Sequence, residues 1–319
     1  MNHRFCVAPM MDKTDRHERY LLRTITNESL LYTEMIHANA VIQGDTASLL
    51  KYHPNEHPLA IQLGGSDPDI LAEAAKISEL LGYKEVNLNV GCPSNKVQKG
   101  EFGAILMKQP KLVAKCIKKI KKSISIPVTV KCRIGVDDMD EKKDLNFFIK
   151  VVNNEGCDAF IIHARKAWLN GLSPKENREI PPLNYNRVYR LKDKFQKVKI
   201  IINGGITTLD QCKKHLSFVD GVMMGREAYT NPYILENVDR DLFGKKKQKK
   251  SREDILIEYL PYLKKEYENG TKLSLITKHL FGLFKGIHGA KEIRKFLAGI
   301  DLVQDPIGQF EKVIIGYNK

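Results

Sequence analysis

A cysteine in this sequence directly follows an apolar run, in a context that suits chemistry. Cys92 lies in GCPSNK, immediately after EVNLNV at residues 85–90. The glycine before it and the proline after it favour a sharp turn that presents the side chain. A free thiol is mostly protonated at neutral pH and can donate a proton. The other five cysteines have no such context and are expected to be small buried hydrophobes. Cys92 is therefore the candidate general acid.

Polar side chains also stand near the ends of other apolar runs, and the strand period of two assigns them to faces. In each run the polar residues share one face, opposite the apolar residues: Asn87 and Asn89 in VNLNV, Lys131 and Arg133 in VTVKCR, His163 and Arg165 in FIIHAR. Such groups are costly to bury without hydrogen-bond partners. Either a ligand rich in acceptors satisfies them, or they bond one another and the neighbouring backbone. The size of the set favours the ligand.

Two glycine-containing segments indicate a phosphate site. The sequences Asn203-Gly204-Gly205 and Gly225-Arg226 each follow a short apolar run. Glycine lets a backbone approach a ligand closely, and N–H groups at the start of a helix bind phosphate. A glycine pair alone often marks only a turn. The two segments together suggest a phosphorylated ligand such as FMN.

The candidate site residues can lie close together only if the strands that carry them are parallel and end at the same edge of one sheet. Eight apolar runs with little charge fit buried parallel strands, at residues 5–9, 30–34, 59–63, 85–90, 127–132, 159–164, 199–203 and 221–225. Helical patterns lie between them, including 68–81 behind the N-cap candidate Asp67, 110–122 and 184–195. Eight strands alternating with helices predict a (β/α)8 TIM barrel, with its chemistry at the carboxyl ends of the strands. An open doubly wound sheet is the alternative, but no G-x-G-x-x-G follows the first run.

The pattern of strands stops after the barrel region. Gly244 and the run KKKQKK at 245–250 divide an α/β domain at 1–243 from a helical domain at 244–319. One helical face is predicted from Ile276, Leu280, Leu283, Phe284 and Ile287. Residues 245–319 hold 16 Lys and Arg against nine Asp and Glu, so half of the net charge of +14 lies in this tail. The excess favours a polyanionic partner, although a merely basic surface would look the same.

Other classes of protein are disfavoured by composition. The sequence has no apolar run of about 20 residues and no apolar stretch near its start that suits a secretory signal. We therefore expect a soluble cytoplasmic protein without a membrane span. The six cysteines are irregularly spaced and form no C-x-x-C pair, which disfavours a zinc site, an iron–sulfur cluster or a disulfide framework. No metal is expected.

Several long motifs occur in the order typical of one enzyme family. They are APMMDKTDRHERYLLR, IQLGG, NLNVGCPS, VKCRIGVDD, HARKAWLNGLSPKENREIPPL, IINGGI and GVMMGREAY, and GIHGAKEIRKFL extends the pattern into the tail. The sequence resembles the tRNA dihydrouridine synthase family from about Phe5 onward. The long HARKAWLNGLSPKENREIPPL stretch resembles the bacterial A-type subfamily in particular.

The resemblance implies an FMN-containing barrel with a C-terminal helical domain that binds tRNA. The implied cofactor-binding residues are Pro9, Met10, Met11, Gln62, Lys131, His163, Asn203, Gly204, Gly205, Gly225 and Arg226. Gln62 would hydrogen-bond the flavin ring, Lys131 would lie at its N1/O2 edge, and the last five residues would hold the phosphate. Cys92 would be the general acid and Asn89 would orient the base. The implied tRNA contacts are Lys175 and Arg178. Lys291 and Arg294 lie three residues apart, so we expect them to share a helix face and to bind phosphates together.

The activity implied is the reduction of tRNA D-loop uridines 20 and 20a to 5,6-dihydrouridine. We expect the protein to be monomeric. NADPH would reduce FMN, flavin N5 would deliver hydride to C6 of a flipped-out uracil, and Cys92 would protonate C5. Two alternatives remain open. One is another FMN barrel, of the dihydroorotate dehydrogenase type, for which the basic tail has no use. The other is a tRNA-folding chaperone, for which the placed cysteine and lysine have no use.

Overall fold

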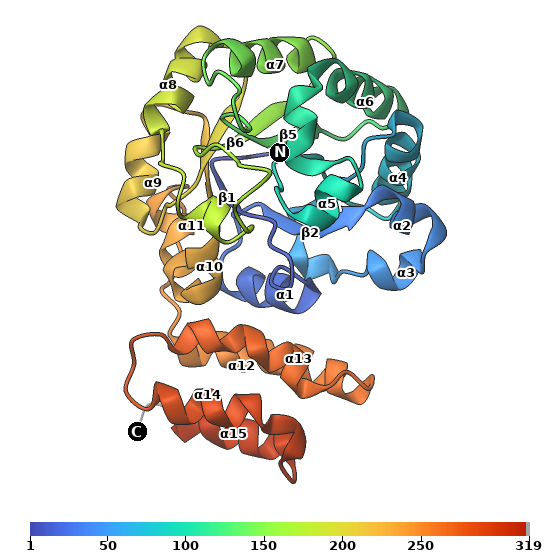
Figure 1. The fold of residues 1–319 in the computed structure, drawn as a ribbon. Coiled ribbons are helices and arrows are strands. Elements are labelled where there is room, and N and C mark those ends of the chain that lie inside the picture. The colour runs from blue at the N-terminus through green and yellow to red at the C-terminus, as the bar shows by residue number, and fades with distance from the viewer. Residues whose placement is uncertain (317–319) are drawn as a thin grey trace.

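The computed structural model describes residues 1–316 and contains a barrel of eight parallel strands (Figure 1). The strands are β1 (Phe5–Val7), β2 (Leu31–His37), β3 (Leu59–Gly64), β4 (Val86–Val90), β5 (Val128–Arg133), β6 (Ala159–His163), β7 (Ile200–Asn203) and β8 (Gly221–Met224). Neighbours pair in the order β1-β8-β7-β6-β5-β4-β3-β2, and a bridge between Cys6 and Leu30 joins β1 to the start of β2. The predicted TIM barrel is confirmed, and the open sheet is excluded.

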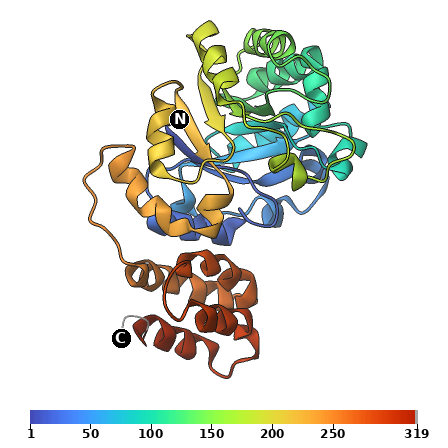
Figure 2. The ribbon, with the colours of Figure 1, turned by 60° about the vertical axis from the view of Figure 1, so that its left-hand side comes forward.

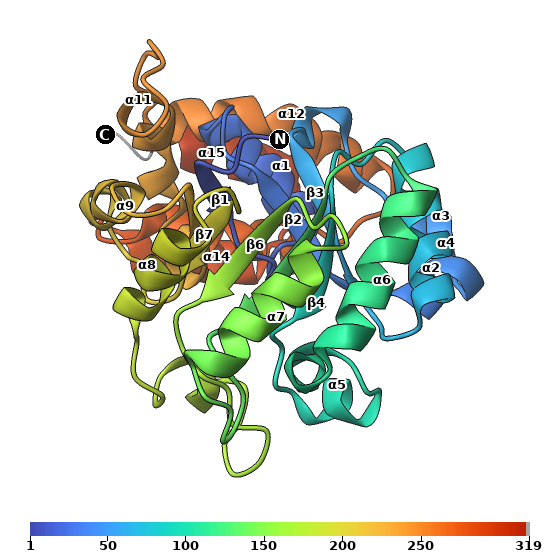
Figure 3. The same cartoon turned by 90° about the horizontal axis from the view of Figure 1, so that it is seen from above.

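Helices alternate with the strands, and most of them form a ring that is seen along the barrel axis in Figure 1 and from the side in Figure 3. They are α1 (Arg16–Ile25), α2 (Ala38–Gln43), α3 (Thr46–Leu49), α4 (Pro68–Leu80), α5 (Asn95–Lys99), α6 (Pro110–Ser123), α7 (Lys143–Asn153), α8 (Tyr185–Lys194), α9 (Leu209–Leu216), α10 (Arg226–Thr230) and α11 (Val238–Asp241). The predicted cap is present, because the Asp67 carboxylate accepts from the N–H groups of Asp69 and Ile70. The strand predicted at 30–34 was too short, since β2 continues to His37.

The two faces of the strands separate as alternation requires. Outward-facing residues such as Val128, Val130 and Cys132 belong to the core between sheet and helices. A second, smaller apolar cluster fills the barrel interior and includes Tyr32 and Ile161. The polar residues of β4, β5 and β6 share the interior face, so they are held inside the barrel or at its mouth.

The chain continues into a group of helices beside the barrel. These are α12 (Arg252–Glu268), α13 (Leu273–Thr277), α14 (Ala290–Ala298) and α15 (Pro306–Gly316). The apolar residues predicted to share one face over 276–287 do pack into the core. The single helix predicted for them was wrong, because α13 gives way to the 3-10 helix η5 (Lys278–Phe284) and Ile287 lies beyond it. A Cβ on Gly282 would lie 2.5 Å from the Tyr229 carbonyl oxygen, so η5 packs closely against the end of α10. The division at residues 243 and 244 remains a prediction.

Part of the lysine run is bound to the barrel rather than free. The run lies in the segment that leads from α11 to α12 (Figure 2). Lys247 lies 3.3 Å from the Asp239 carboxylate, Lys245 lies 3.5 Å from Glu28, and Lys250 donates to the Thr24 carbonyl oxygen at 2.9 Å. The two carboxylate contacts, of Lys245 and Lys247, neutralise some of the positive charge that the sequence places in the tail.

Helix α1 joins the barrel to the C-terminal helices through a buried polar interface. His279 Nε2 lies 2.9 Å from Asp15 Oδ2, and the Tyr259 hydroxyl donates to the His17 carbonyl oxygen at 3.1 Å. His17 Nδ1 lies 2.8 Å from the Tyr262 hydroxyl. All of these side chains are largely buried except that of Asp15. The helices are therefore held in a fixed place on the barrel.

This interface should make folding stability sensitive to acid through His17. Burial and the neighbouring Arg16 lower the pKa of His17 to about 4. A histidine whose folded-state pKa lies below its unfolded value of about 6.5 destabilises the fold as pH falls through that window. Wild type should lose about 2–3 kcal/mol more than His17→Gln between pH 7 and pH 4.5, measured by urea unfolding. His288→Gln, outside this interface, is the control, and equal acid loss in wild type and His17→Gln would contradict the assignment.

Candidate active site

The turn that carries Cys92 is held by the side chain of Asn89. Asn89 Oδ1 accepts from the backbone N–H groups of Gly91 at 3.1 Å and Cys92 at 3.0 Å. The Cys92 thiol lies 3.7 Å from Ser94 Oγ and is half-buried, whereas the other five cysteines are buried. The turn thus presents one thiol at the carboxyl end of β4, as the sequence predicted.

Lys131 lies inside the barrel mouth, next to Asn203 at the end of β7. Its ammonium group donates to Asn203 Oδ1 at 3.1 Å, and Asn203 Nδ2 donates to the Met223 carbonyl oxygen at 2.8 Å. Burial, followed by the proximity of Arg133, lowers the pKa of Lys131 to about 8. Asn203 supplies one acceptor to a group with three N–H donors, so an acceptor-rich ligand would be favourable here.

Cationic side chains surround His163 at the end of β6. Burial lowers the pKa of His163 well below its ordinary value, and Arg133, Lys131, Arg165 and Arg178 lower it further. His163 is therefore neutral, and the cluster has an excess of positive charge. An anionic ligand would compensate that charge.

The glycines after β7 and β8 serve two different purposes. Gly204 and Gly205 have φ angles of +118° and +67°. A Cβ on Gly204 would lie 2.6 Å from the His163 ring, and one on Gly205 would lie 2.5 Å from Leu183. Close packing within the protein therefore requires both glycines. At Gly225 a Cβ would meet only Ala8, at 3.8 Å, which leaves open space at the start of α10.

Gln62 and Asn89 already have protein partners. Gln62 Nε2 donates to Asn87 Oδ1 at 2.7 Å, and Gln62 Oε1 accepts from Asn89 Nδ2 at 2.8 Å. Gln62 is 1% exposed. Gln62 keeps one N–H and one lone pair, whereas Asn89 keeps one N–H only, because its oxygen already accepts two hydrogen bonds. Their roles toward the flavin and the base stay predictions.

The segment after β1 lines the same end of the barrel. Pro9 and Met10 are half-buried, whereas Met11 is 53% exposed. The Met10 N–H donates to Thr14 Oγ1 at 3.0 Å, which fixes the start of the loop.

Arg133 joins the Cys92 turn to the loop after β6. The sequence placed it among the polar strand-end residues but assigned it no role of its own. Its Nε donates to the Gly91 carbonyl oxygen at 3.0 Å, and its Nη1 donates to the Asn177 carbonyl oxygen at 2.9 Å. Asn177 lies in the 3-10 helix η3 (Glu176–Arg178), so Arg133 connects this helix, with the exposed Lys175 and Arg178 at its two ends, to the Cys92 turn. The alternation that placed Lys131 inside the barrel also placed Arg133 there.

Two further sets of predicted site residues lie at the surface: Arg226, predicted to hold the phosphate, and Lys291 with Arg294, predicted to contact tRNA. The Arg226 guanidinium pairs with Glu179 at 2.6 Å, so a phosphate would have to share or replace that carboxylate. Lys291 and Arg294 are exposed on α14, one turn apart. They belong to the helices below the barrel in Figure 1 and are not brought to the strand ends.

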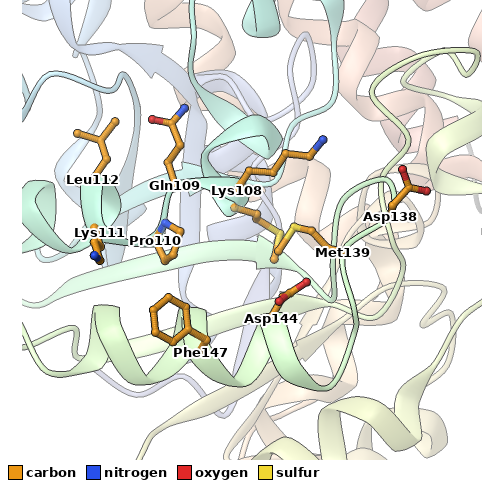
Figure 4. Close-up of a pocket in the computed structure, with 10 residues that line it drawn as sticks. Lys108, Gln109, Pro110, Lys111, Leu112, Asp138, Met139, Asp144 and Phe147 are labelled. Carbon is orange, nitrogen blue, oxygen red and sulfur yellow. The ribbon is translucent and has the colours of Figure 1, made fainter.

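A surface cavity of about 690 Å³ lies elsewhere, between η2 (Gly103–Lys108), α6 and α7 (Figure 4). Lys108, Met139 and Phe147 are among its lining residues, and no predicted site residue is. Its position outside the barrel separates it from the strand-end cluster.

Within residues 1–316, no helix is both long and apolar enough to cross a membrane. The same part of the chain contains no group of three or more His, Cys, Asp or Glu side chains that could hold a metal ion.

Comparison with known proteins identifies similar sequences and folds. The family model described as "Dihydrouridine synthase (Dus)" matches residues 6–314. Relatives named tRNA-dihydrouridine(20/20a) synthase include one from Synechocystis sp., 54% identical over 93% of this chain and 89% of its own. Another, from Vibrio parahaemolyticus, is 49% identical over 97% of each chain.

Solved structures with the same fold are far more distant in sequence. Morphinone reductase matches with a TM-score of 0.54 at 11% identity, over 79% of this chain and 88% of its own. A 2-naphthoyl-CoA reductase complex matches with a TM-score of 0.54 at 13% identity, over 74% of this chain and 49% of its own, about half its length. At these identities the likeness shows the barrel fold alone.

Proposed function

Because the chain belongs to the dihydrouridine synthase family, we propose that it reduces uridines 20 and 20a of tRNA to dihydrouridine with FMN and NADPH. The observation that carries the proposal is the half-buried thiol of Cys92 at a barrel mouth that also contains Lys131. A proton donor and a cation at one mouth are what reduction of a polarised double bond needs.

The residues at the mouth fit FMN. The cationic cluster around His163 would compensate the phosphate, and the open backbone at Gly225 and the start of α10 would face it. Lys131 has N–H donors to spare for the flavin N1/O2 edge. When bound, FMN supplies the hydride that adds to C6 of the uracil.

The chain itself would position the base and supply the proton. Cys92 would hold its thiol proton toward uracil C5, in a turn fixed by Asn89. The free N–H of the Asn89 amide would remain to orient the base. Arg133 would keep the loop with Lys175 and Arg178 beside the thiol, where these exposed cations would contact tRNA phosphates.

Absorbance spectroscopy tests whether the protein binds flavin, reduces it with NADPH and reoxidises it with tRNA. The purified protein should show flavin absorbance, which NADPH should bleach under anaerobic conditions. Adding unmodified tRNA should restore the absorbance, whereas orotate, a free pyrimidine with an unreduced C5–C6 double bond, should not. A colourless protein that does not take up FMN would overturn the proposal, and restoration by free pyrimidine alone would favour the other FMN barrel.

The C-terminal helices should bind the body of the tRNA. Lys291→Ala combined with Arg294→Ala should weaken tRNA binding and lower the slope of log affinity against log salt by about one unit for each phosphate that is no longer neutralised. NADPH oxidation should be unchanged, because neither residue lies at the strand ends. Affinities measured at several salt concentrations check this result. Lys111→Ala with Lys115→Ala, on α6, is the matched control, and equal effects of the two pairs would contradict a specific role for α14.

A further inference from the structure

A chain of hydrogen bonds begins at the end of the barrel opposite Cys92. Glu85 directly precedes β4 and is fully buried. Its Oε1 accepts from the Thr129 hydroxyl at 2.7 Å. Thr129 Oγ1 in turn accepts from Asn87 Nδ2 at 2.8 Å. The chain therefore starts on a buried carboxylate and passes between β5 and β4 inside the barrel.

The same chain continues to the Cys92 turn. Asn87 Oδ1 accepts from Gln62, Gln62 Oε1 accepts from Asn89, and Asn89 Oδ1 accepts from the Gly91 and Cys92 N–H groups. Every link donates in the direction of Glu85. Aligned hydrogen bonds polarise and strengthen one another in a buried setting.

The two ends of the chain determine this direction. A backbone N–H can only donate, so Asn89 must turn its oxygen to the Cys92 turn. At the other end, the Glu85 carboxylate faces three partners: Thr129, the Tyr32 hydroxyl at 2.7 Å and His3 Nε2 at 2.6 Å. Burial raises the pKa of Tyr32, so its hydroxyl keeps its proton and donates. Both ends therefore require the same orientation of the three amides.

We propose that Glu85 and Thr129 are positioning residues, which hold the Cys92 turn through the side chains of Asn87, Gln62 and Asn89. They act at a distance from the reacting atoms. The effect on catalysis rests on the proposed function, whereas the effect on the turn does not.

Breaking the chain of hydrogen bonds at Thr129 should loosen the Cys92 turn. In Thr129→Val, Asn87 Nδ2 loses its acceptor, and a buried donor without a partner is costly. Reversing all three amides would relieve that cost, but the Asn89 NH₂ would then face the Gly91 and Cys92 N–H groups. The variant should therefore spend more time with the turn released.

Hydrogen exchange of the protein without added flavin tests this directly. In Thr129→Val, the Gly91 and Cys92 N–H groups should exchange about tenfold faster than in wild type, the effect of one net hydrogen bond. Thr129→Ser keeps the hydroxyl and should restore wild-type exchange. Tyr32→Phe removes an equally buried hydrogen bond to Glu85 that is not part of the chain of hydrogen bonds. It should leave hydrogen exchange at Gly91 and Cys92 within about twofold of wild type. If Thr129→Val does not fold, Thr129→Ala takes its place.

Steady-state kinetics supply the second readout. Thr129→Val should lower kcat for tRNA reduction with little change in KM, and Tyr32→Phe should not. Unchanged exchange at Gly91 and Cys92 in Thr129→Val, or an equal increase in Tyr32→Phe, would overturn the proposal. Failure of wild type to reduce tRNA would instead contradict the proposed function and leave the exchange result valid.

Discussion

Cys92→Ala should still bind FMN and oxidise NADPH, while its formation of dihydrouridine should fall about 10²–10⁴-fold, the usual contribution of a general acid. The loss follows because the thiol is the proton donor proposed to face uracil C5. It does not contribute to the cationic cluster that would hold the phosphate. The flavin should therefore be reduced normally and then stay reduced when tRNA is added.

Stopped-flow absorbance separates the two half-reactions of this variant. Cys116→Ala, which removes a buried thiol from α6, is the control and should behave as wild type. Reoxidation of the flavin by tRNA at the wild-type rate in Cys92→Ala would remove Cys92 from its role.

Lys131→Met should nearly abolish both half-reactions and, at the same time, stabilise the protein without flavin. Within residues 1–316, its amino group is the only cation hydrogen-bonded to Asn203, and it would face the flavin edge where negative charge develops. Methionine has a similar length but no charge. The rates of flavin reduction and of reoxidation should both fall.

The gain in stability follows from the pKa of Lys131, which burial lowers to about 8. A lysine whose folded-state pKa lies below its unfolded value costs stability below pH 8, and this cost shrinks as pH rises through the window up to about 10.4. Lys131→Met should therefore be more stable than wild type by about 1–3 kcal/mol at pH 7 and by less than half of that at pH 10. Urea unfolding at both pH values measures it. A variant that is less stable than wild type at pH 7 would mean that interactions in the folded protein compensate for the cost of burying the Lys131 charge.

The fold could be predicted because its signals are local and repeated. Buried parallel strands are apolar on both faces, and eight such runs between helical patterns leave few arrangements. Asp67 was predicted as a cap from its position alone, and its contacts agree. The change from α13 to the 3-10 helix η5 within residues 276–287 was not predicted, and the close approach of Gly282 to Tyr229 in this segment depends on a partner far away in the sequence.

The site was predictable where a residue is chemically unusual for its place. Lys131 and Cys92 stand out against their neighbours, and the structure brings them to one mouth. Glu85 falls on the same strand face as Asn87 and Asn89. Its position at the start of the strand, however, gave no reason to connect it to the Cys92 turn. The pairing of Arg226 with Glu179 likewise joins the start of α10 to the loop after β6, which only the closed barrel brings together.

Analysis of the tRNA product tests the central claim most directly. Unmodified tRNA is incubated with the protein, FMN and NADPH, then digested and mapped by mass spectrometry. The account predicts a gain of two hydrogens at uridines 20 and 20a, absent with Cys92→Ala. Unmodified uridine at both positions, from a flavin-loaded wild-type protein that oxidises NADPH, would contradict it.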